Sequence, residues 1–373
     1  MLNRSYILLG AALAASLSMA AQAPDTLKEA YRGAFHVGVA INVAQITGKD
    51  AIGDALIAQQ FDSITPENVM KWEVIHPKVD TYNFDLADKY VAFGEKNHMF
   101  IVGHNLCWHS QTPDWVFKDA QGKRVGRDVL LQRLHDHIAT VVGRYKGRIQ
   151  GWDVVNEALA EDGSLRKSKW FEIIGEDYIV KAYQWAHEAD PQMQLNYNDY
   201  NLQSAAKRKG AMALVKKLQA AGIPIAVVGS QDHVRIDWPS AEDEDATIKD
   251  LASLGVKIAI TELDVDVLPS VSFASADVSL HAAQDPKLNP YPNGLPAAMQ
   301  TKLAEQYAML FRVYLKNRAS MSRVTLWGLT DADSWRNDWP VTGRTDDCLL
   351  FDRKDQPKPA LYAVIDEARK ARR

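Results

Sequence analysis

Eight short apolar segments alternate along the chain with longer segments of helical period, and this alternation restricts the fold more than any other feature. The apolar segments span residues 35–42, 63–68, 100–108, 149–157, 194–199, 226–233, 257–264 and 324–330. The intervening segment 128–145 places Leu130, Leu134, Ile138 and Val141 on one face, which is typical of an amphipathic helix. Strands that alternate with helices predict a parallel sheet with helices outside it. Eight such units predict an α/β fold, a (β/α)8 TIM barrel in a single domain.

A doubly wound open sheet is the alternative fold. It would require a glycine-rich phosphate turn after an early strand, and no G-x-G-x-x-G occurs in the sequence. Residues 24–373 are therefore expected to form one barrel domain. The segment 268–296 is rich in Ser, Ala, Pro and Asn, and we expect an inserted loop there, because the barrel still needs the following helix and strand.

The N-terminus has the layout of a secretory signal peptide, predicted to span residues 1–23. Asn3 and Arg4 precede an apolar run over 7–17, and small residues follow. The run is shorter than the ~20 residues that a membrane-spanning helix needs. We expect an exported protein, periplasmic or released, with cleavage after Ala20 or Ala23 and no membrane association afterwards.

The charge and cysteine content exclude several classes of protein. Lys and Arg number 43 against 47 for Asp and Glu, and the net charge of −4 argues against nucleic acid as a partner. The chain has no H-E-x-x-H motif, so we expect neither a metal nor another cofactor. Cys107 lies on the predicted third strand and Cys348 follows the predicted last strand, and this separation favours two free thiols over a disulfide.

Polar and aromatic residues gather where the predicted strands end, which is the active-site face of a TIM barrel. In strand order they are Glu67, Asn68 and Lys71; His104, Trp108 and Gln111; Asn156 and Glu157; Asn198 and Tyr200; Gln231 and His233; Glu262 and Asp264; and Trp327 and Trp335.

Two glutamates follow strongly apolar strands, where a carboxylate is unfavourable unless it is paired or used. They are Glu157 on the fourth strand and Glu262 on the seventh. One alternative is that each forms a structural ion pair with Lys71 or Arg336. The presence of both favours acetal hydrolysis, which needs a proton donor for the leaving oxygen and a carboxylate at the oxocarbenium-like carbon.

Five segments resemble the glycoside hydrolase family 10 endo-β-1,4-xylanases, in family order from about residue 27 to the C-terminus. They are TPENVMKW (65–72), GHNLCWH (103–109), WDVVNE (152–157), ITELD (260–264) and WGLTD (327–331), the last followed by DSW (333–335). The resemblance implies a retaining enzyme that acts on xylan and xylo-oligosaccharides, and the chain is expected to be a monomer.

The resemblance also implies roles for individual residues. Glu157 would be the general acid/base and Glu262 the nucleophile, with carboxyl groups ~5 to 5.5 Å apart. Apolar surroundings and the nearby charge of Glu262 should raise the pKa of Glu157. Asn156 would bind the sugar 2-hydroxyl, and His233, held by Asp264, would orient Glu262. The expected substrate contacts are Glu67, Asn68, Lys71, His104, Trp108 and Gln111 on the glycone side, Gln231 near the reacting sugar, Trp327 and Trp335 as sugar platforms, and Asn198, Tyr200 and Asn201 on the leaving-group side.

Three other functions compete with this interpretation. A metal-dependent barrel hydrolase lacks ligands at the usual spacing. A catalytically inactive sugar-binding barrel should have lost one of the two glutamates. Cellulase activity on the same scaffold stays open, because β-1,4-glucan differs from β-1,4-xylan only at C6 and the discrimination is small.

Overall fold

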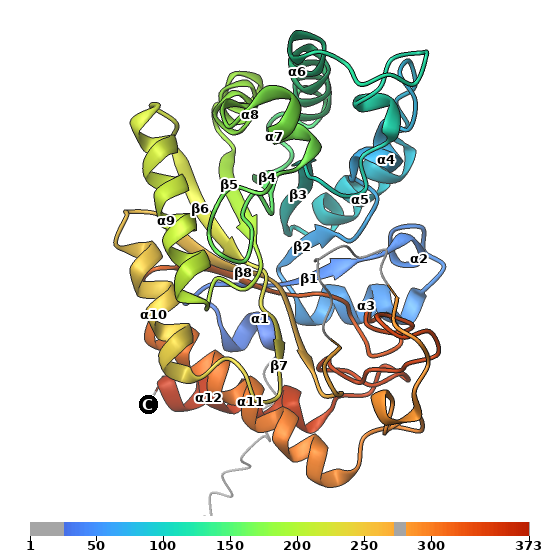
Figure 1. Ribbon diagram of the computed structural model, residues 1–373. Helices are drawn as coiled ribbons and strands as arrows, with labels where there is room; N and C mark the ends of the chain where they lie inside the picture. Colours follow the sequence, from blue (N-terminus) through green and yellow to red (C-terminus); the bar gives the residue numbers. More distant parts are fainter. Residues whose placement is uncertain (1–25, 272–280, 373) are drawn as a thin grey trace, which may run out of the picture.

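The computed structural model describes residues 26–271 and 281–372, so the predicted signal peptide, residues 1–23, lies outside the described residues. Eight parallel strands form the barrel (Figure 1). They are β1 (His36–Ile41), β2 (Ser63–Pro66), β3 (Phe100–Cys107), β4 (Gly151–Asn156), β5 (Gln194–Asp199), β6 (Ile225–Ser230), β8 (Lys257–Asp266) and β9 (Met321–Leu326). Each strand pairs with its neighbour in the ring, and the pairing of β6 with β8 closes it, which confirms the predicted TIM barrel.

Helices cover the outside of the barrel (Figure 1). They are α1 (Leu27–Ala30), α2 (Val43–Ile46), α3 (Ala51–Gln60), α4 (Trp72–Ile75), α5 (Asp85–Lys96), α6 (Arg127–Arg144), α7 (Lys169–Ile174), α8 (Asp177–Ala189), α9 (Ala205–Ala220), α10 (Ala241–Ala252), α11 (Ala297–Lys316) and α12 (Pro359–Ala371). Two single 3₁₀ turns, Asp114–Val116 and Pro286–Leu288, lie in loops.

The helix boundaries follow local signals in the sequence. In α6 the predicted apolar face, including Leu130, Leu134 and Ile138, is buried. The Ser240 hydroxyl accepts a hydrogen bond from the Asp243 N–H at the start of α10, where carboxylates also meet the positive end of the helix dipole. Gly222, with φ of 76°, follows the end of α9, where glycine adopts the left-handed conformation without steric cost.

The predicted sixth strand, 226–233, is broken in the structure. β6 ends at Ser230, and Asp232 adopts a φ of 58°. The chain then forms a short additional strand, β7 (His233–Arg235), which pairs with β8 so that His233 lies opposite Asp264. β6 is already paired with β8, so the break shifts the register along β8 by one residue, from Ser230 opposite Ile260 to His233 opposite Asp264. The last strand also differs, because it occupies 321–326 instead of 324–330.

The described ends of the loop 268–296 pack against the segment that follows β9. The Ala282 N–H donates to the Pro340 carbonyl at 2.7 Å, and Gln284 Nε2 donates to the Thr342 carbonyl at 3.0 Å. Residues 272–280 lie outside the described residues, while Ser270 and Val271 line the main cleft. The loop therefore reaches the active face of the barrel.

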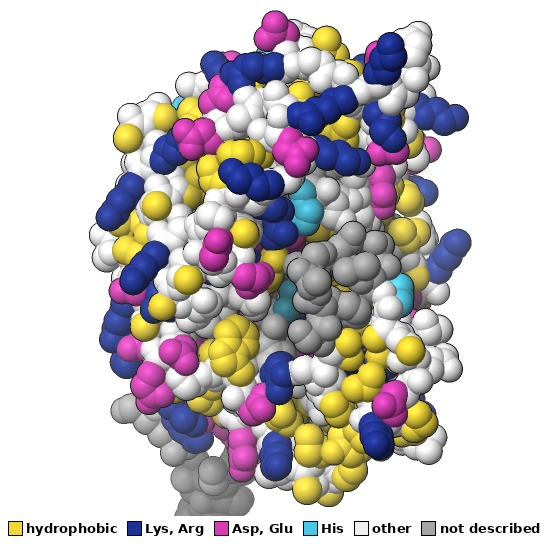
Figure 2. Space-filling view, in the orientation of Figure 1, with side chains coloured by type: hydrophobic (Ala, Val, Ile, Leu, Met, Phe, Trp, Pro, Cys, Tyr) yellow, Lys and Arg dark blue, Asp and Glu magenta, His cyan; other side chains and the backbone are white. Residues whose placement is uncertain are grey.

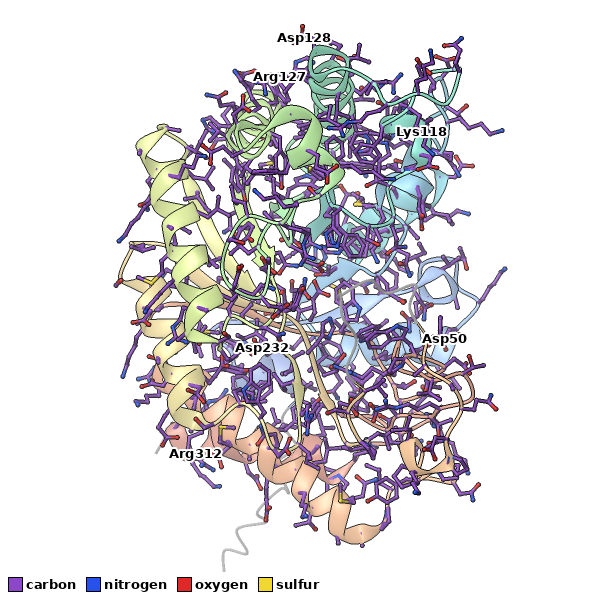
Figure 3. All side chains as sticks on the ribbon, in the orientation of Figure 1. Asp50, Lys118, Arg127, Asp128, Asp232 and Arg312 are labelled. Carbon is purple, nitrogen blue, oxygen red and sulfur yellow. The ribbon has the colours of Figure 1, made fainter. Side chains whose placement is uncertain are left out.

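Apolar side chains form the buried core, and charged side chains lie mostly at the surface. Side chains fill the space between sheet and helices, where Asp232 is buried, whereas Arg312 lies at the periphery (Figure 3). Positive and negative side chains are interspersed over the face in Figure 2.

Both cysteines are buried free thiols, as predicted. In the part of the chain that the structure describes, no helix has the length and apolarity to cross a membrane.

Candidate active site

A cleft of about 660 Å³ opens at the carboxyl ends of the barrel strands. Of the seventeen residues predicted for the site, all line this cleft except Asn198 and Asp264, which lie behind it. Parallel strands present their carboxyl ends on one face of the barrel, so residues distant in sequence converge there.

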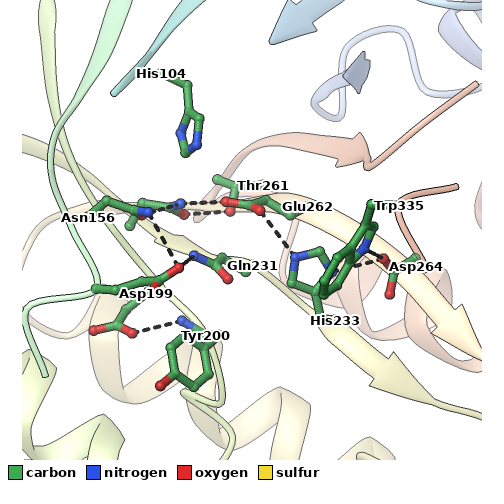
Figure 4. A network of polar contacts seen from close by, with 12 residues as sticks. His104, Asn156, Asp199, Tyr200, Gln231, His233, Thr261, Glu262, Asp264 and Trp335 are labelled. Carbon is green, nitrogen blue, oxygen red and sulfur yellow. Dashed lines mark hydrogen bonds and ion pairs between the residues drawn. The ribbon is translucent and has the colours of Figure 1, made fainter. Parts of the chain in front are cut away.

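The Glu262 carboxylate is held from two sides (Figure 4). Asn198 Nδ2 donates to its Oε1 at 2.7 Å, and His233 Nε2 lies 3.1 Å from its Oε2. The other ring nitrogen, Nδ1, lies 2.9 Å from Asp264 Oδ2. Burial lowers the pKa of His233, but the charges of Asp264 and Glu262 and their hydrogen bonds outweigh it and raise that pKa to about 9. A protonated imidazole therefore holds Glu262 in place at neutral pH.

Asp264 is the fixed point behind this histidine. It is fully buried and also accepts hydrogen bonds from Trp335 Nε1 at 2.7 Å and Arg336 Nε at 2.8 Å. Burial raises its pKa, but the charges of Arg336 and His233 lower it below the ordinary value. The spacing of Glu262 and Asp264 on one face of β8 thus produces the shared histidine contact predicted from the sequence.

Glu157 has a different environment. Gln231 Nε2 donates to its Oε1 at 3.0 Å, and His109 Nδ1 lies 3.8 Å from its Oε2. Burial raises the pKa of Glu157, but the positive charge of His109 and hydrogen bonds from Gln231 and Trp108 leave it below the ordinary value. The predicted rise is therefore wrong in this structure, because the prediction omitted the donors that the fold brings to this carboxylate.

The backbone at Glu157 is also constrained. Its φ is 55°, a left-handed backbone conformation that residues other than glycine rarely adopt. The Glu157 N–H donates to the Asn198 carbonyl at 2.9 Å, and its own carbonyl accepts a hydrogen bond from Arg166 Nε at 2.9 Å. Strained backbone of this kind persists where surrounding contacts over-determine it, which is common at functional sites.

The alternative in which Glu157 and Glu262 form structural ion pairs with Lys71 or Arg336 is not supported by the contacts of these two cations. Lys71 Nζ donates to Asn68 Oδ1 at 2.9 Å and to Gln111 Oε1 at 2.7 Å. Arg336 pairs with Asp264 and with Asp266. Burial lowers the pKa of Lys71, and nearby carboxylates, Glu262 first among them, partly offset this.

The remaining predicted contacts form the wall and floor of the cleft. Trp108 lies beside the Lys71 ammonium, 5.1 Å from ring centroid to Nζ. His104 Nδ1 lies 2.9 Å from Asp153 Oδ2, and the His104 ring contacts Trp327 edge to face. Burial raises the pKa of Glu67 on the same side. Flat rings beside amides and charges suit a sugar, which exposes apolar C–H faces and hydroxyls together.

Other cleft residues were absent from the predicted set. They are Glu161, Arg235, Asp266, Ser270, Val271, Arg336, Trp339, Pro340 and Arg344. Strand periodicity could have found two of them, because Arg235 follows His233 and Asp266 follows Asp264 on the same strand face. No His, Cys, Asp and Glu grouping suited to a metal occurs within residues 26–271 and 281–372.

A TIM barrel whose active face carries two buried glutamates in one cleft lined with aromatic and polar side chains has the arrangement of a glycoside hydrolase. Comparison with known proteins agrees. Residues 26–367 match the model of glycosyl hydrolase family 10, and the chain belongs to this family.

Individual relatives cover nearly the whole chain. Endo-1,4-beta-xylanase A of Xylanibacter ruminicola is 44% identical over 94% of this chain and 95% of its own length. Beta-1,4-xylanase of Dictyoglomus thermophilum is 40% identical over 91% of this chain and 90% of its own. The solved structure of a GH10 endoxylanase from a sugarcane soil metagenome superposes with a TM-score of 0.88 at 48% identity, covering 91% of this chain and 99% of that one.

Proposed function

We propose that this protein is a retaining endo-1,4-β-xylanase, with Glu262 as nucleophile and Glu157 as general acid/base. The observation that carries the proposal is the different support of the two carboxylates in one cleft. Glu262 is fixed by Asn198 and a protonated His233, which suits an ionised nucleophile. Glu157 lies among Gln231, Trp108 and His109, polar groups beside a carboxyl group that must give up and regain a proton in the reaction.

In the first step, Glu262 attacks the anomeric carbon while Glu157 gives its proton to the departing glycosidic oxygen. A covalent glycosyl-enzyme forms, and the C–O bond to the leaving sugar breaks. In the second step, Glu157 removes a proton from water, and this water displaces Glu262 from the sugar. Configuration at the anomeric carbon is retained because two inversions occur.

Glu157 must be protonated at the start, although its pKa lies below the ordinary value. The positive charge of His109, whose Nδ1 lies 3.8 Å from Glu157 Oε2, is one cause of this lowered pKa. When that ring carries a proton it favours the ionised carboxylate, and when the ring is neutral this effect is absent. The charge of His109 therefore affects how readily Glu157 holds the proton that it gives to the leaving oxygen.

Preference for xylan over glucan rests on the relatives and on the crowded glycone side. Lys71 is buried and held by Asn68 and Gln111, and Trp335 is fixed through its indole N–H. Side chains held this firmly leave little freedom to admit a C6 hydroxymethyl group. Asn156 would bind the 2-hydroxyl of the reacting sugar, an interaction that strengthens in the transition state.

The test is hydrolysis of xylan and carboxymethylcellulose side by side, by the wild type and by Glu262→Ala. Xylan cleavage by the wild type that disappears in the variant supports both the substrate and the nucleophile. Equal cleavage of the two polymers contradicts the pentose preference. Activity that survives the substitution contradicts the assigned mechanism.

We also propose that the enzyme is exported and acts as a monomer. Export rests on the charged, apolar and small-residue segments within residues 1–23. Expression of the full chain followed by N-terminal sequencing of the extracellular and periplasmic fractions should give a mature protein that begins at residue 21 or 24. Light scattering should give a mass near that of one chain.

A further inference from the structure

Lys207, on α9, places a buried ammonium directly behind the cleft. Its side chain is fully buried, and Nζ lies 3.0 Å from Asp199 Oδ1 and 3.6 Å from Glu161 Oε1. The same Nζ lies 3.1 Å from the centroid of the Tyr200 ring. Tyr200 and Glu161 line the cleft, whereas Lys207 does not.

Tyr200 is also held through its hydroxyl group. Arg166 donates from one terminal nitrogen to the Tyr200 hydroxyl at 2.7 Å and to the Leu159 carbonyl at 3.0 Å. The Arg166 Nε donates to the carbonyl of Glu157 at 2.9 Å. One guanidinium therefore connects the Tyr200 ring to the backbone of the proposed acid/base residue.

Asp199 ties this arrangement to two loops. It accepts hydrogen bonds from the Tyr200 N–H at 2.9 Å, from the Leu159 N–H at 3.3 Å, and from the Tyr197 hydroxyl. Figure 4 shows Asp199 and Tyr200 at one end of the polar network, with His233 and Trp335 at the other. Burial raises the pKa of Asp199 to about 6, and the Lys207 charge opposes that rise.

A buried ion pair of this kind is poor evidence for stability, since the loss of hydration offsets the attraction of the charges. The position of the Lys207 ammonium against Tyr200 instead suggests a local role in holding that ring. A cation against the face of a tyrosine fixes the plane of that ring. With Lys207 against the ring and Arg166 at its hydroxyl, Tyr200 has little freedom to tilt.

We propose that Lys207 is a positioning residue for the leaving-group side of the cleft, the part lined by Glu161, Tyr200 and Asn201. Its ammonium holds the Tyr200 ring as a flat platform for the neutral pyranose that follows the scissile bond. Through Tyr200 and Arg166 it also keeps Glu157 in register with that sugar. This inference rests on the proposed function, because it assigns the leaving-group side from Glu157 as the acid.

The test compares two substrates in Lys207→Met. Xylohexaose places sugars on the leaving-group side, whereas 2,4-dinitrophenyl β-xylobioside places none there and has a leaving group that departs without a proton. We expect kcat/KM for xylohexaose to fall about tenfold or more, because small displacements of a substrate-positioning group have large rate effects. The value for the aryl substrate should change less than about twofold, on the ordinary scale of a distant substitution.

Two further variants protect the test against loss of folding. Lys207→Met leaves Asp199 buried without its cation, so the double variant Lys207→Met/Asp199→Asn removes both charges and should show the same substrate split. Lys217→Met makes the same change on the exposed side of α9, where Lys217 pairs with Glu176, and should leave both substrates unaffected.

A double-mutant cycle with Tyr200→Ala separates positioning from general stability. If Lys207 acts through Tyr200, Lys207→Met adds little further loss on xylohexaose once the ring is absent. Equal losses on both substrates, or full additivity of the two substitutions, would overturn the inference. Failure of the wild type to cleave xylohexaose would contradict the proposed function instead.

Discussion

Asn198 donates a hydrogen bond from Nδ2 to Glu262 Oε1 at 2.7 Å, and this contact sets the orientation of the carboxylate. The amide is itself oriented by the Thr261 hydroxyl, which donates to its oxygen at 2.6 Å. If the amide turned over, its oxygen would face the carboxylate and repel it. A threonine beside the nucleophile therefore controls which end of Asn198 faces Glu262.

Thr261→Val should lower kcat on xylan about tenfold, equivalent to ~1.4 kcal/mol, because the Asn198 amide loses the bond that fixes its orientation. Thr261→Ser keeps the hydroxyl and serves as the control. Steady-state kinetics of both variants provide the measurement, with unfolding midpoints to show that both are folded. Equal activity of the valine and serine variants would remove this role from Thr261.

Glu157→Gln should slow hydrolysis of xylo-oligosaccharides by about 10²–10⁴-fold, because an amide cannot protonate the leaving oxygen. With 2,4-dinitrophenyl β-xylobioside, the first step should stay fast and the second become slow. Stopped-flow absorbance should therefore show a burst of dinitrophenolate. A slow first step with this substrate would argue against Glu157 as the acid.

His109→Asn should raise the pKa of Glu157, because it removes the positive charge that helps hold this pKa below its ordinary value. The measurement is a ¹³C NMR titration of labelled glutamate carboxyls, with Glu157→Gln identifying the signal. His135→Asn, at an exposed histidine on α6, is the matched control and should leave the signal unchanged. An unshifted Glu157 titration in His109→Asn would contradict the proposed coupling.

His233 should make the protein less stable as the pH rises from about 6.5 to about 9. The pKa of a histidine in the unfolded chain is ~6.5, whereas the pKa of His233 in the folded protein is about 9. Between these two pH values the folded state therefore binds this proton more tightly than the unfolded state. The stabilisation is complete below the lower value, amounts to on the order of 3 kcal/mol, and is lost as the pH passes the upper value.

Urea unfolding of the wild type and of His233→Asn across pH 6 to 10 measures this contribution. The difference in unfolding free energy between the two proteins should shrink over that range. A difference that is independent of pH would show that the folded and unfolded proteins bind this proton equally well.

Much of the candidate site could be predicted from the order of residues at strand ends. Glu262 and Asp264 share a strand face by simple alternation, and both meet His233 in the structure. The predicted cleft residues converge because parallel strands place their carboxyl ends on one face. The shared strand face and the convergence followed from periodicity and the rules of the barrel, whereas the roles of the individual residues followed from the resemblance to family 10.

Other features depended on contacts between distant segments. The break at Asp232 shifts the register so that His233 lies opposite Asp264. It has no strong local signal, since the residues around it were predicted as one continuous strand. The low pKa of Glu157 arises from Gln231, Trp108 and His109, which come from other strands and loops. The Lys207 contact with Tyr200 differs from these, because the two residues are only seven positions apart. It depends on how α9 packs against the preceding loop, which the spacing alone does not predict.

The sequence by itself determined the barrel, the face that carries the chemistry and the two glutamates, because hydrophobic period and residue type are local properties. Only the tertiary structure decided which groups hold each carboxylate and in which direction the pKa of Glu157 moves. Hydrogen bonding and electrostatic interaction in a buried site depend on distances of a few ångströms. Those distances are set by packing between segments that are far apart in the chain.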